Sequence, residues 1–291
     1  MISLIITAYK EPRTIGRAIE AIASGNVGKN EIIVAAPDKE TLDAAMKLKK
    51  KYPQLRTIKD NGKGKPAALN LVVKKAKGDI LVLSDGDVYV SKNAVEKMIR
   101  IMEDEKIGAV SGNPVSIDAK DNKLGFWAHV LSSVANDVRK GALKNGKRLF
   151  CSGYLFAIRK KLFPKLPEEL LSEDGYISQN VYDKGFQIGY SEQSKVFIKY
   201  PSTFEDWIKQ KKRSAGGYNQ IKNLTGKTMR SFSWESSGAL KLFKYVSGIR
   251  ELVWLFELFV ARVYLWSVIY RDINVKKKSQ KEIWVRVEST K

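Results

Sequence analysis

Strand and helix signals alternate along the first 110 residues of this 291-residue chain. Short apolar runs rich in β-branched residues predict strands, and apolar residues recur at helical spacing between them, as at Ile15, Ile19 and Ile22. The predicted strands are 2–8, 31–36, 55–58, 79–84 and 107–111, and the predicted helices are 13–23, 39–51, 66–76 and 92–103. This order is typical of an α/β fold with a doubly wound, mostly parallel sheet flanked by helices.

The regular alternation fades after residue 111. A helix over 124–140, a strand over 149–158 and a helix over 173–184 are predicted there. Residues 200–291 hold 18 basic and 8 acidic residues and five of the six tryptophans. We therefore expect a main domain over 1–220, divided into halves at 1–111 and 112–220, and a helical, aromatic-rich, basic C-terminal extension over 221–291.

The formal net charge is +21, which implies attraction to anions such as nucleic acid, an anionic membrane surface or phosphorylated ligands. Cys151 is the single cysteine, so the chain forms no internal disulfide, which fits a reducing compartment. The amino-terminal residues do not resemble a signal peptide, and we expect a cytoplasmic location. The first predicted strand is not followed by G-x-G-x-x-G, which argues against a dinucleotide site, and the P-loop motif is also missing.

Two carboxylates one residue apart follow the strand predicted at 79–84. Its apolar run leads directly into Ser84, Asp85, Gly86 and Asp87. In open α/β sheets ligands bind at the carboxyl ends of strands, and side chains at i and i+2 of an extended segment share one face. Hard oxygen donors without Cys or His neighbours favour Mg²⁺ or Mn²⁺, so Asp85 and Asp87 are candidate metal ligands. The alternative interpretation is an ordinary Asp-Gly-Asp surface turn.

Five short motifs follow one another along the chain. They are ITAYKEP (6–12), GKGKPAALN (62–70), SDGDV (84–88), LSEDGYIS (171–178) and QKKRSAGGYNQ (210–220). In this order, on a strand–helix background, they resemble the inverting glycosyltransferases of family 2, which have the GT-A fold. The resemblance covers roughly residues 1–220, and it implies a nucleotide-sugar half at 1–111 and an acceptor half at 112–220.

The resemblance implies a nucleotide-diphosphate sugar as the donor and a divalent cation, Mn²⁺ or Mg²⁺, as the cofactor. It makes Asp87 the metal ligand, with Asp85 contacting the metal or the nucleotide. The further donor-binding residues that it implies are Ala8, Tyr9, Glu11, Lys65, Asn70, Gly153, Gln210 and Arg213. Among these, Ala8 and Tyr9 would line the base pocket, and Arg213 would reach the diphosphate, whose oxygens suit a planar guanidinium.

The chain departs from the family pattern at three places, one of which is Lys10 where the family usually has asparagine. The second predicted strand ends in Ala35, Ala36 and Pro37, where family members carry acidic residues, one of which reads the base. The base contact is therefore missing or shifted to Asp38, which leaves recognition of uridine open. Ser214 replaces the tryptophan of the Gln-x-x-Arg-Trp motif, which weakens the comparison with processive polysaccharide synthases.

The motif at 171–178 supplies the candidate general base. An inverting displacement needs one group that deprotonates the acceptor hydroxyl as it attacks the anomeric carbon. The resemblance assigns Glu173 and Asp174 to this position, and Asp174 is the predicted base. The alternative is a helix start with Ser172 as its cap and two acids in its first turn, and both interpretations can hold together.

Two other classes of function compete with the transferase. The charge and the basic, aromatic-rich C-terminal third are compatible with a nucleic-acid-binding protein, but no RRM, KH or helix-turn-helix signature is present, and we expect no nucleic-acid partner. A sugar nucleotidyltransferase also uses a βαβ sheet and metal-binding carboxylates. Such enzymes carry a Gly-rich loop after the first strand, whereas the turn at residues 7–11 here contains no glycine.

Residues 252–270 are apolar apart from Glu257, Arg262 and Ser267. A helix that is apolar on all faces is either buried in protein or placed in lipid, and 19 residues approach the roughly 20 that span a bilayer. An arginine near the centre costs about 2.5–3.5 kcal/mol on insertion scales, so a simple span is expensive. We expect the chain to lie peripherally at the cytoplasmic membrane face, aided by Lys276, Lys277 and Lys278, with a lipid-linked glycan or polyprenyl phosphate as acceptor. The alternative is a core helix.

Overall fold

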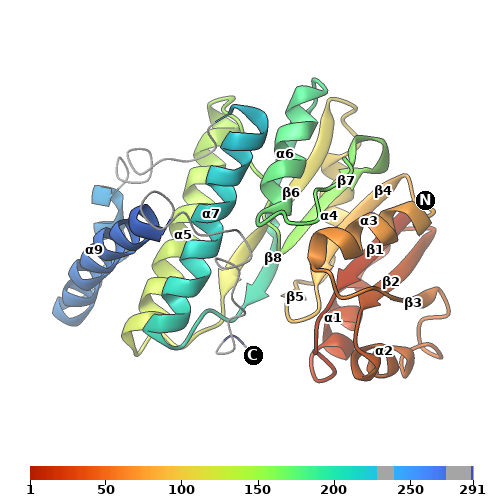
Figure 1. The fold of residues 1–291 in the computed structure, drawn as a ribbon, viewed down its shortest axis with the longest axis horizontal. Helices are drawn as coiled ribbons and strands as arrows, with labels where there is room; N and C mark the ends of the chain where they lie inside the picture. The colour runs from red at the N-terminus through yellow and green to blue at the C-terminus, as the bar shows by residue number, and fades with distance from the viewer. Residues whose placement is uncertain (228–238, 273–289, 291) are drawn as a thin grey trace. The chain divides into compact units, whose positions relative to one another are not determined.

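A computed structural model describes residues 1–227, 239–272 and 290 (Figure 1). Trp234, Trp284 and the lysines at 276–278 lie outside the described residues. The chain divides into two compact units. Unit 1 comprises residues 1–115, 136–168 and 176–198, and unit 2 comprises residues 116–135, 169–175 and 199–291. The boundary expected at residue 220 falls within helix α7 (Phe204–Thr225), and the division into a domain over 1–220 and an extension stays a prediction.

The described residues form one sheet with the strand order β3-β2-β1-β4-β7-β6-β8-β5 (Figure 1). Its strands are β1 (Ile2–Thr7), β2 (Asn30–Ala36), β3 (Leu55–Lys59), β4 (Ile80–Asp85), β5 (Tyr89–Val90), β6 (Ile107–Ser116), β7 (Leu155–Arg159) and β8 (Gln187–Ile198). The β3-β2-β1-β4 half is parallel, as the strand–helix alternation predicts. The pairs β4–β7, β6–β7 and β5–β8 are antiparallel, so the sheet as a whole is mixed.

The helices that follow the parallel strands form where the apolar spacing predicts them. They are α1 (Ile15–Ile22), α2 (Lys39–Met46) and α3 (Lys65–Lys75), and α4 (Ala94–Ile101) follows the short strand β5. Helix α1 buries Ile15, Ala18, Ile19 and Ile22, which are the apolar positions at helical spacing. Helix α3 starts after Gly64, whose φ of 98° is in the region that favours glycine. The helix starts therefore lie at the carboxyl ends of the strands, where the site residues are expected.

The remaining elements are α5 (Lys123–Lys144), η1 (Lys160–Leu162), α6 (Glu173–Asp183), α7, η2 (Ala239–Tyr245) and α9 (Ile249–Tyr270). Strands β5 and β8 were not predicted, and the strand expected at 149–158 begins only at Leu155. Strand β8 has an exposed polar stretch around Glu192 and Gln193 that interrupts its apolar pattern. The two-residue β5 is too short to show any periodicity.

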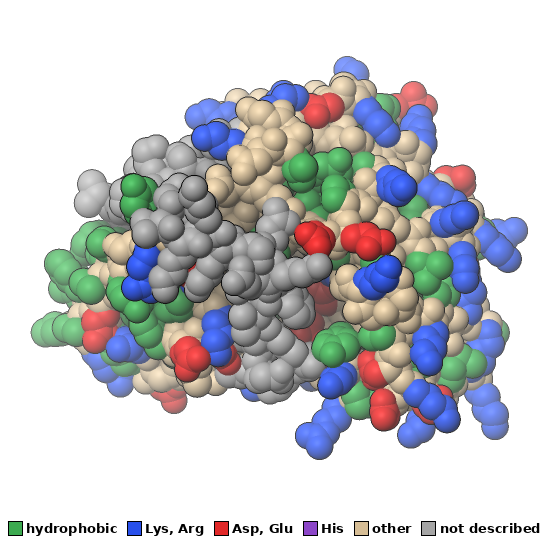
Figure 2. Space-filling model, viewed as in Figure 1, with side chains coloured by type: hydrophobic (Ala, Val, Ile, Leu, Met, Phe, Trp, Pro, Cys, Tyr) green, Lys and Arg blue, Asp and Glu red, His purple; other side chains and the backbone are tan. Residues whose placement is uncertain are grey.

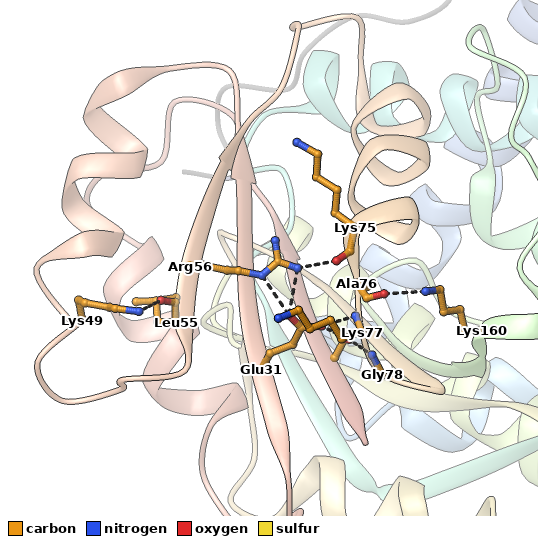
Figure 3. Close-up of polar contacts among 10 residues, drawn as sticks. Glu31, Lys49, Leu55, Arg56, Lys75, Ala76, Lys77, Gly78 and Lys160 are labelled. Carbon is orange, nitrogen blue, oxygen red and sulfur yellow. Dashed lines mark hydrogen bonds and ion pairs between the residues drawn. The ribbon is translucent and has the colours of Figure 1, made fainter.

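A buried carboxylate organises the amino-terminal edge of the parallel strands (Figure 3). Glu31 Oε1 accepts hydrogen bonds from Ser3 Oγ at 2.7 Å and from the Lys77 backbone N–H at 2.5 Å. Glu31 Oε2 accepts a bond from Arg56 Nε at 3.0 Å. Ser3 Oγ also accepts a bond from the Gly78 N–H, and a Cβ at Gly78 would lie only 2.5 Å from the Ser3 backbone nitrogen. The network therefore ties the segment before β4 to β1, β2 and β3.

Replacing Glu31 with Ala should lower the free energy of unfolding by about 3 kcal/mol at neutral pH, because the partly buried Arg56 loses its counter-ion. Burial alone would raise the pKa of the Glu31 carboxyl, but the bonds from Ser3, Lys77 and Arg56 outweigh it and hold the pKa below its ordinary value. Because its pKa is lowered in the folded state, the ionised Glu31 carboxyl contributes fully to the free energy of unfolding above about pH 4.3, its ordinary pKa. This contribution is lost as the pH falls through the pKa of the folded state.

Urea unfolding at several pH values measures this contribution. The difference between wild type and Glu31→Ala should shrink between about pH 5 and about pH 3. Glu20→Ala is the matched control, because its pair with Lys51 (2.6 Å) is exposed and should contribute less than about 1 kcal/mol. Equal losses in the two variants would contradict the role given to Glu31.

Candidate active site

The carboxyl ends of β1, β2 and β4 lie at the same level of the sheet. Thr7 is paired with Asp85 of β4 on one side and with Ala35 of β2 on the other. Strand β4 ends at Asp85, and Gly86 and Asp87 form the turn that follows. The two candidate metal ligands therefore stand at the edge of the sheet where ligands of α/β folds bind.

Asp85 joins two other predicted donor-binding residues. Its Oδ1 lies 2.7 Å from Lys65 Nζ and accepts a hydrogen bond from Thr7 Oγ1 at 3.2 Å. Lys65 Nζ also donates to the Gly153 carbonyl at 3.2 Å. Lys65 is the first residue of α3, and Gly153 precedes β7, so residues far apart in the sequence converge on the end of β4. The Lys65 ammonium is thereby held where it can meet an anionic ligand.

Because residue 86 is glycine, the motif at 6–12 can pack against the turn that follows β4. A Cβ at Gly86 would overlap Glu11 Oε2 and would lie 2.7 Å from Ala8 Cβ. Ala8 and Glu11, both predicted to be near the donor, therefore lie directly beside the carboxylate pair. Tyr9 between them is exposed, as a residue that stacks on a base would be.

Asp87 is half-buried and forms no hydrogen bond or ion pair with the residues that the structure describes. The described residues also contain no group of three or more His, Cys, Asp or Glu side chains that could hold a metal alone. Mg²⁺ and Mn²⁺ are commonly bound through one or two carboxylates together with substrate phosphates and water. The hard carboxylates of Asp85 and Asp87 fit such a cation, with Asp87 available as a ligand.

Asp38 is engaged by the backbone. Its carboxylate accepts bonds from the N–H groups of Lys10 (2.8 Å) and Thr41 (3.0 Å), so it caps α2 and fixes the turn after β1. Burial alone would raise the pKa of Asp38, but these bonds and one to the Thr41 hydroxyl outweigh it and lower the pKa. A direct contact of Asp38 with the base stays a prediction.

Asp60, just after β3, is a carboxyl group that the sequence motifs did not indicate. It accepts a bond from the Gly62 N–H at 2.7 Å. Partial burial, together with the nearby Asp38 charge, raises the pKa of Asp60 despite that bond. The sequence indicated Asp60 only through its position at the end of a parallel strand. That strand is next to β2, whose end lacks the acidic residues of the family.

Asn70 has a structural role. Its Nδ2 donates to the Leu166 carbonyl at 2.8 Å, and its Oδ1 accepts from the Leu166 N–H at 2.9 Å. The amide therefore fastens α3 to the segment after η1. Contact of Asn70 with the donor stays a prediction.

The predicted base lies at the start of α6, in unit 2. Asp174 Oδ1 accepts bonds from Ser172 Oγ at 2.6 Å and from the Gly175 N–H at 2.9 Å. Helix α6 does begin at Glu173, as the alternative interpretation of this motif required. Ser172, expected as the cap, donates its hydroxyl to the Asp174 carboxylate. The carboxylate is thus fixed by two donors at a helix N-terminus.

Helix α7 holds the loop that carries Asp174. Gln220 Oε1 accepts from the Leu171 N–H at 2.9 Å, and Gln220 Nε2 donates to the Glu169 carbonyl at 3.0 Å. A Cβ at Gly217 would lie 2.6 Å from Ser172 Cβ, so only glycine permits this close approach of helix and loop. Gln220 and Gly217 therefore immobilise the loop at 169–175, a role that the sequence did not indicate.

Gln210 and Arg213 lie one turn apart on α7 and share a face. Gln210 is 8% exposed, and its Oε1 is buried without a hydrogen-bond partner in the described part of the chain. Arg213 is half-buried and forms no ion pair with any described residue. The unneutralised guanidinium of Arg213 is suited to an anionic ligand group, and the buried amide oxygen of Gln210 is suited to a hydrogen-bond donor.

Known proteins resemble this chain in sequence and in fold. The sequence profile of "Glycosyl transferase family 2" matches residues 3–166. Probable glycosyltransferase YdaM of Bacillus subtilis is 28% identical over an alignment of 233 residues, and the alignment covers 76% of this chain and 56% of that protein. Poly-beta-1,6-N-acetyl-D-glucosamine synthase of Staphylococcus aureus is 25% identical over 227 residues, 76% of this chain and 55% of that protein. The chain thus spans about half the length of the curated relatives it matches.

Solved structures share the fold. A mannosyltransferase from Pyrobaculum calidifontis in complex with GDP-Man and Mn²⁺ has a TM-score of 0.66 and 15% identity, covering 96% of this chain and 88% of that chain. A second structure is glucosyl-3-phosphoglycerate synthase from Mycobacterium tuberculosis in complex with Mn²⁺, UDP and glucosyl-3-phosphoglycerate. Its TM-score is 0.55 at 18% identity, and the match covers 78% of this chain and 80% of that chain. The GT-A type of fold expected from the sequence is confirmed. Since the profile matches more than half of its residues, the chain belongs to glycosyl transferase family 2.

Proposed function

We propose that the chain transfers a sugar, with inversion at the anomeric carbon, from a nucleotide-diphosphate sugar to a hydroxyl or phosphate acceptor. The observation that carries this proposal is the convergence of Lys65, Asp85 and Gly153 at the end of β4, next to an Asp87 carboxylate without a partner among the described residues. A cation and paired carboxylates at one strand end suit a metal–diphosphate ligand.

Unit 1 binds the donor in this proposal. Asp87 and Asp85 hold a Mn²⁺ or Mg²⁺ ion, which supplies charge neutralisation of the diphosphate leaving group when bound. Lys65 adds a positive charge at the same strand end, and Ala8 and Tyr9 contact the base. Two solved relatives support a metal and a nucleotide, since one is a complex with GDP-Man and Mn²⁺ and the other is a complex with UDP and Mn²⁺.

Asp174 removes the proton of the acceptor. Its carboxylate accepts the hydroxyl proton while the acceptor oxygen forms its bond to the anomeric carbon and the bond from that carbon to the diphosphate breaks. Ser172 and Gly175 keep Asp174 Oδ1 in place. Arg213 serves the anionic part of a substrate and Gln210 Oε1 accepts a hydrogen bond from a donor group of the substrate, because neither group has a partner among the described residues.

The acceptor in this proposal is a lipid-linked glycan or a polyprenyl phosphate, and the chain works peripherally at the cytoplasmic membrane face. The supporting features are the net charge of +21 and helix α9, which by length and composition could cross a membrane. The nucleic-acid-binding and nucleotidyltransferase alternatives do not account for the family match.

A panel of UDP- and GDP-sugars, incubated with Mn²⁺, Mg²⁺ or EDTA, tests this function. We expect release of nucleoside diphosphate with one of the two bases, faster by at least about tenfold with metal than with EDTA, because the leaving group needs charge neutralisation. Chromatography of the nucleotide products is the measurement. Pyrophosphate and a nucleotide sugar formed from NTP and sugar phosphate would instead identify a nucleotidyltransferase. No metal-dependent product from any donor would contradict the proposal.

A further inference from the structure

Helix α9 exposes an apolar stripe along its whole length. The stripe consists of Ile249, Val253, Phe256, Val260, Val263 and Tyr270, and each of these side chains is more than half exposed. Their spacings of three, four and seven residues place them on one face of the helix. In Figure 2 hydrophobic side chains gather over α9. A contiguous exposed apolar face of this kind marks an interaction surface.

The opposite face of α9 is part of the core of unit 2. The α9 residues buried in this core are Leu255, Leu258, Ala261, Leu265 and Ile269. They form one hydrophobic cluster with Phe126 and Trp127 of α5 and Trp207 of α7. Because burial extends from the second turn of α9 to its last turn, the helix lies along the protein over nearly its full length.

Polar contacts fasten α9 at several points. Trp127 Nε1 donates to the Trp254 carbonyl at 2.7 Å, and Lys123 of α5 forms an ion pair with Glu257 at 3.4 Å. Just beyond the helix, Asp272 pairs with Lys212 of α7. If α9 crossed a bilayer in this arrangement, it would carry the polar helix α7 into hydrocarbon, which is prohibitively unfavourable. Only the stripe is therefore available to lipid.

The charges around the stripe favour an anionic surface. The acids of α9 are engaged, Glu257 with Lys123 and Glu251 with the Ser247 N–H at 2.6 Å. Arg250 at the first turn and Arg271 at the end of the helix are exposed. The net charge of +21 would repel a second copy of the chain but attracts a negatively charged bilayer.

We propose that α9 lies flat on an anionic lipid surface, with its stripe inserted into the interface, its buried face kept on α5 and α7, and Arg250 and Arg271 at the headgroups. Amphipathic helices bind membranes in this in-plane way. The inference rests on the proposed function in taking the membrane as the partner. It adds how the helix lies and which residues make the contact.

Flotation of the full chain with vesicles tests the surface. Wild type should float with phosphatidylcholine–phosphatidylglycerol vesicles at low salt, less with phosphatidylcholine alone, and should be partly released by high salt. The double variant Phe256→Glu, Val260→Glu should lose most of this binding. Leu143→Glu, Leu224→Glu is the matched control, since these leucines are 53% and 52% exposed but lie outside α9, and it should float like wild type.

Depth measurements test the flat orientation. Single variants Ile249→Cys, Val260→Cys and Tyr270→Cys are labelled with an environment-sensitive fluorophore, which is selective because Cys151 is buried. Quenching by lipids that carry nitroxides at different depths should place all three labels at a similar, shallow depth. A deep label at Val260 with shallow labels at both ends would show a span and overturn the proposal.

Two further results would also overturn it. One is flotation of the double variant at the wild-type level. The other is a wild type that does not bind vesicles and forms a dimer in light scattering, while the double variant forms no dimer. That result would make the stripe a contact between copies of the chain. Nucleotide release in the absence of vesicles should be unchanged in the double variant. If wild type floats but releases no nucleotide from any donor, the proposed reaction fails while the docking surface stands.

Discussion

Replacing Asp174 with Asn is expected to lower the rate of sugar transfer by about 10²–10⁴-fold, the usual contribution of a general base, and to leave the affinity for the donor unchanged. The amide oxygen of Asn can still accept the bonds from Ser172 Oγ and the Gly175 N–H, so the loop should keep its conformation. The amide cannot take up the acceptor proton. Single-turnover transfer and calorimetric donor binding measure the two effects separately.

Asp183→Asn is the matched control for this experiment. Asp183 is the last residue of the same helix, and its carboxylate also accepts a side-chain bond, from Gln179 at 2.7 Å. Its replacement should leave transfer near the wild-type rate. If Asp174→Asn itself transfers at a near wild-type rate, the base is another group, and Glu173→Gln becomes the next variant to measure.

Replacing Asp87 with Ala should abolish the metal-dependent part of nucleoside diphosphate binding, a loss of about 10²-fold or about 2.7 kcal/mol. Asp87 is the member of the carboxylate pair that has no partner among the described residues, whereas Asp85 is already paired with Lys65. Removal of Asp87 leaves at most one carboxylate for the cation. Calorimetric titration with UDP and GDP, with and without Mn²⁺, gives the metal-dependent difference.

Asp43→Ala is the control for Asp87→Ala. Asp43 is an exposed carboxylate on α2 of the same unit, so its removal changes the net charge equally but should not affect binding. Metal-dependent binding that is retained in Asp87→Ala would refute the assignment. A loss of circular dichroism in the variant would be a folding effect, which thermal unfolding of both variants separates from loss of the ligand.

The sequence predicted the parallel half of the sheet because its signals there are local. Strands β1, β2 and β4 are uninterrupted apolar runs, and the helices between them repeat apolar residues at their own period. The antiparallel half depends on pairings between distant segments. Strand β7 inserts between β4 and β6, and nothing within residues 155–159 indicates either neighbour.

The candidate site was predicted in its residue types and only partly in its contacts. The resemblance to the family implied that Asp85, Lys65 and Gly153 bind the donor, and the structure brings the Asp85 carboxylate and the Gly153 carbonyl within hydrogen-bonding distance of Lys65. The resemblance did not show that the Asn70 amide is engaged by the backbone of Leu166, because that bond links residues 96 positions apart. The Glu31 network was missed for the same reason.

The two faces of α9 differ in burial, which its apolar sequence pattern did not show. From composition, all faces of residues 252–270 look alike, and a buried helix and an interfacial helix were equally compatible. The structure distinguishes the faces, since Leu258 and Leu265 pack in the core whereas Phe256 and Val260 are exposed. The difference arises from which side meets α5 and α7, and a single segment of sequence does not contain that information.

The contact between Gln220 and the loop at 169–175 limits how this chain could be shortened or recombined. The family profile ends at residue 166, yet the loop with Asp174 is fastened by side-chain bonds and a glycine that lie about fifty residues further on. A chimaera that joins residues 1–166 to another family member must therefore take the loop and α7 from the same protein. If the loop alone were exchanged, the foreign loop would have to fit against Gly217 and Gln220. The loop at 169–175 and α7 therefore form one structural unit, and the motif at 171–178 is only part of it.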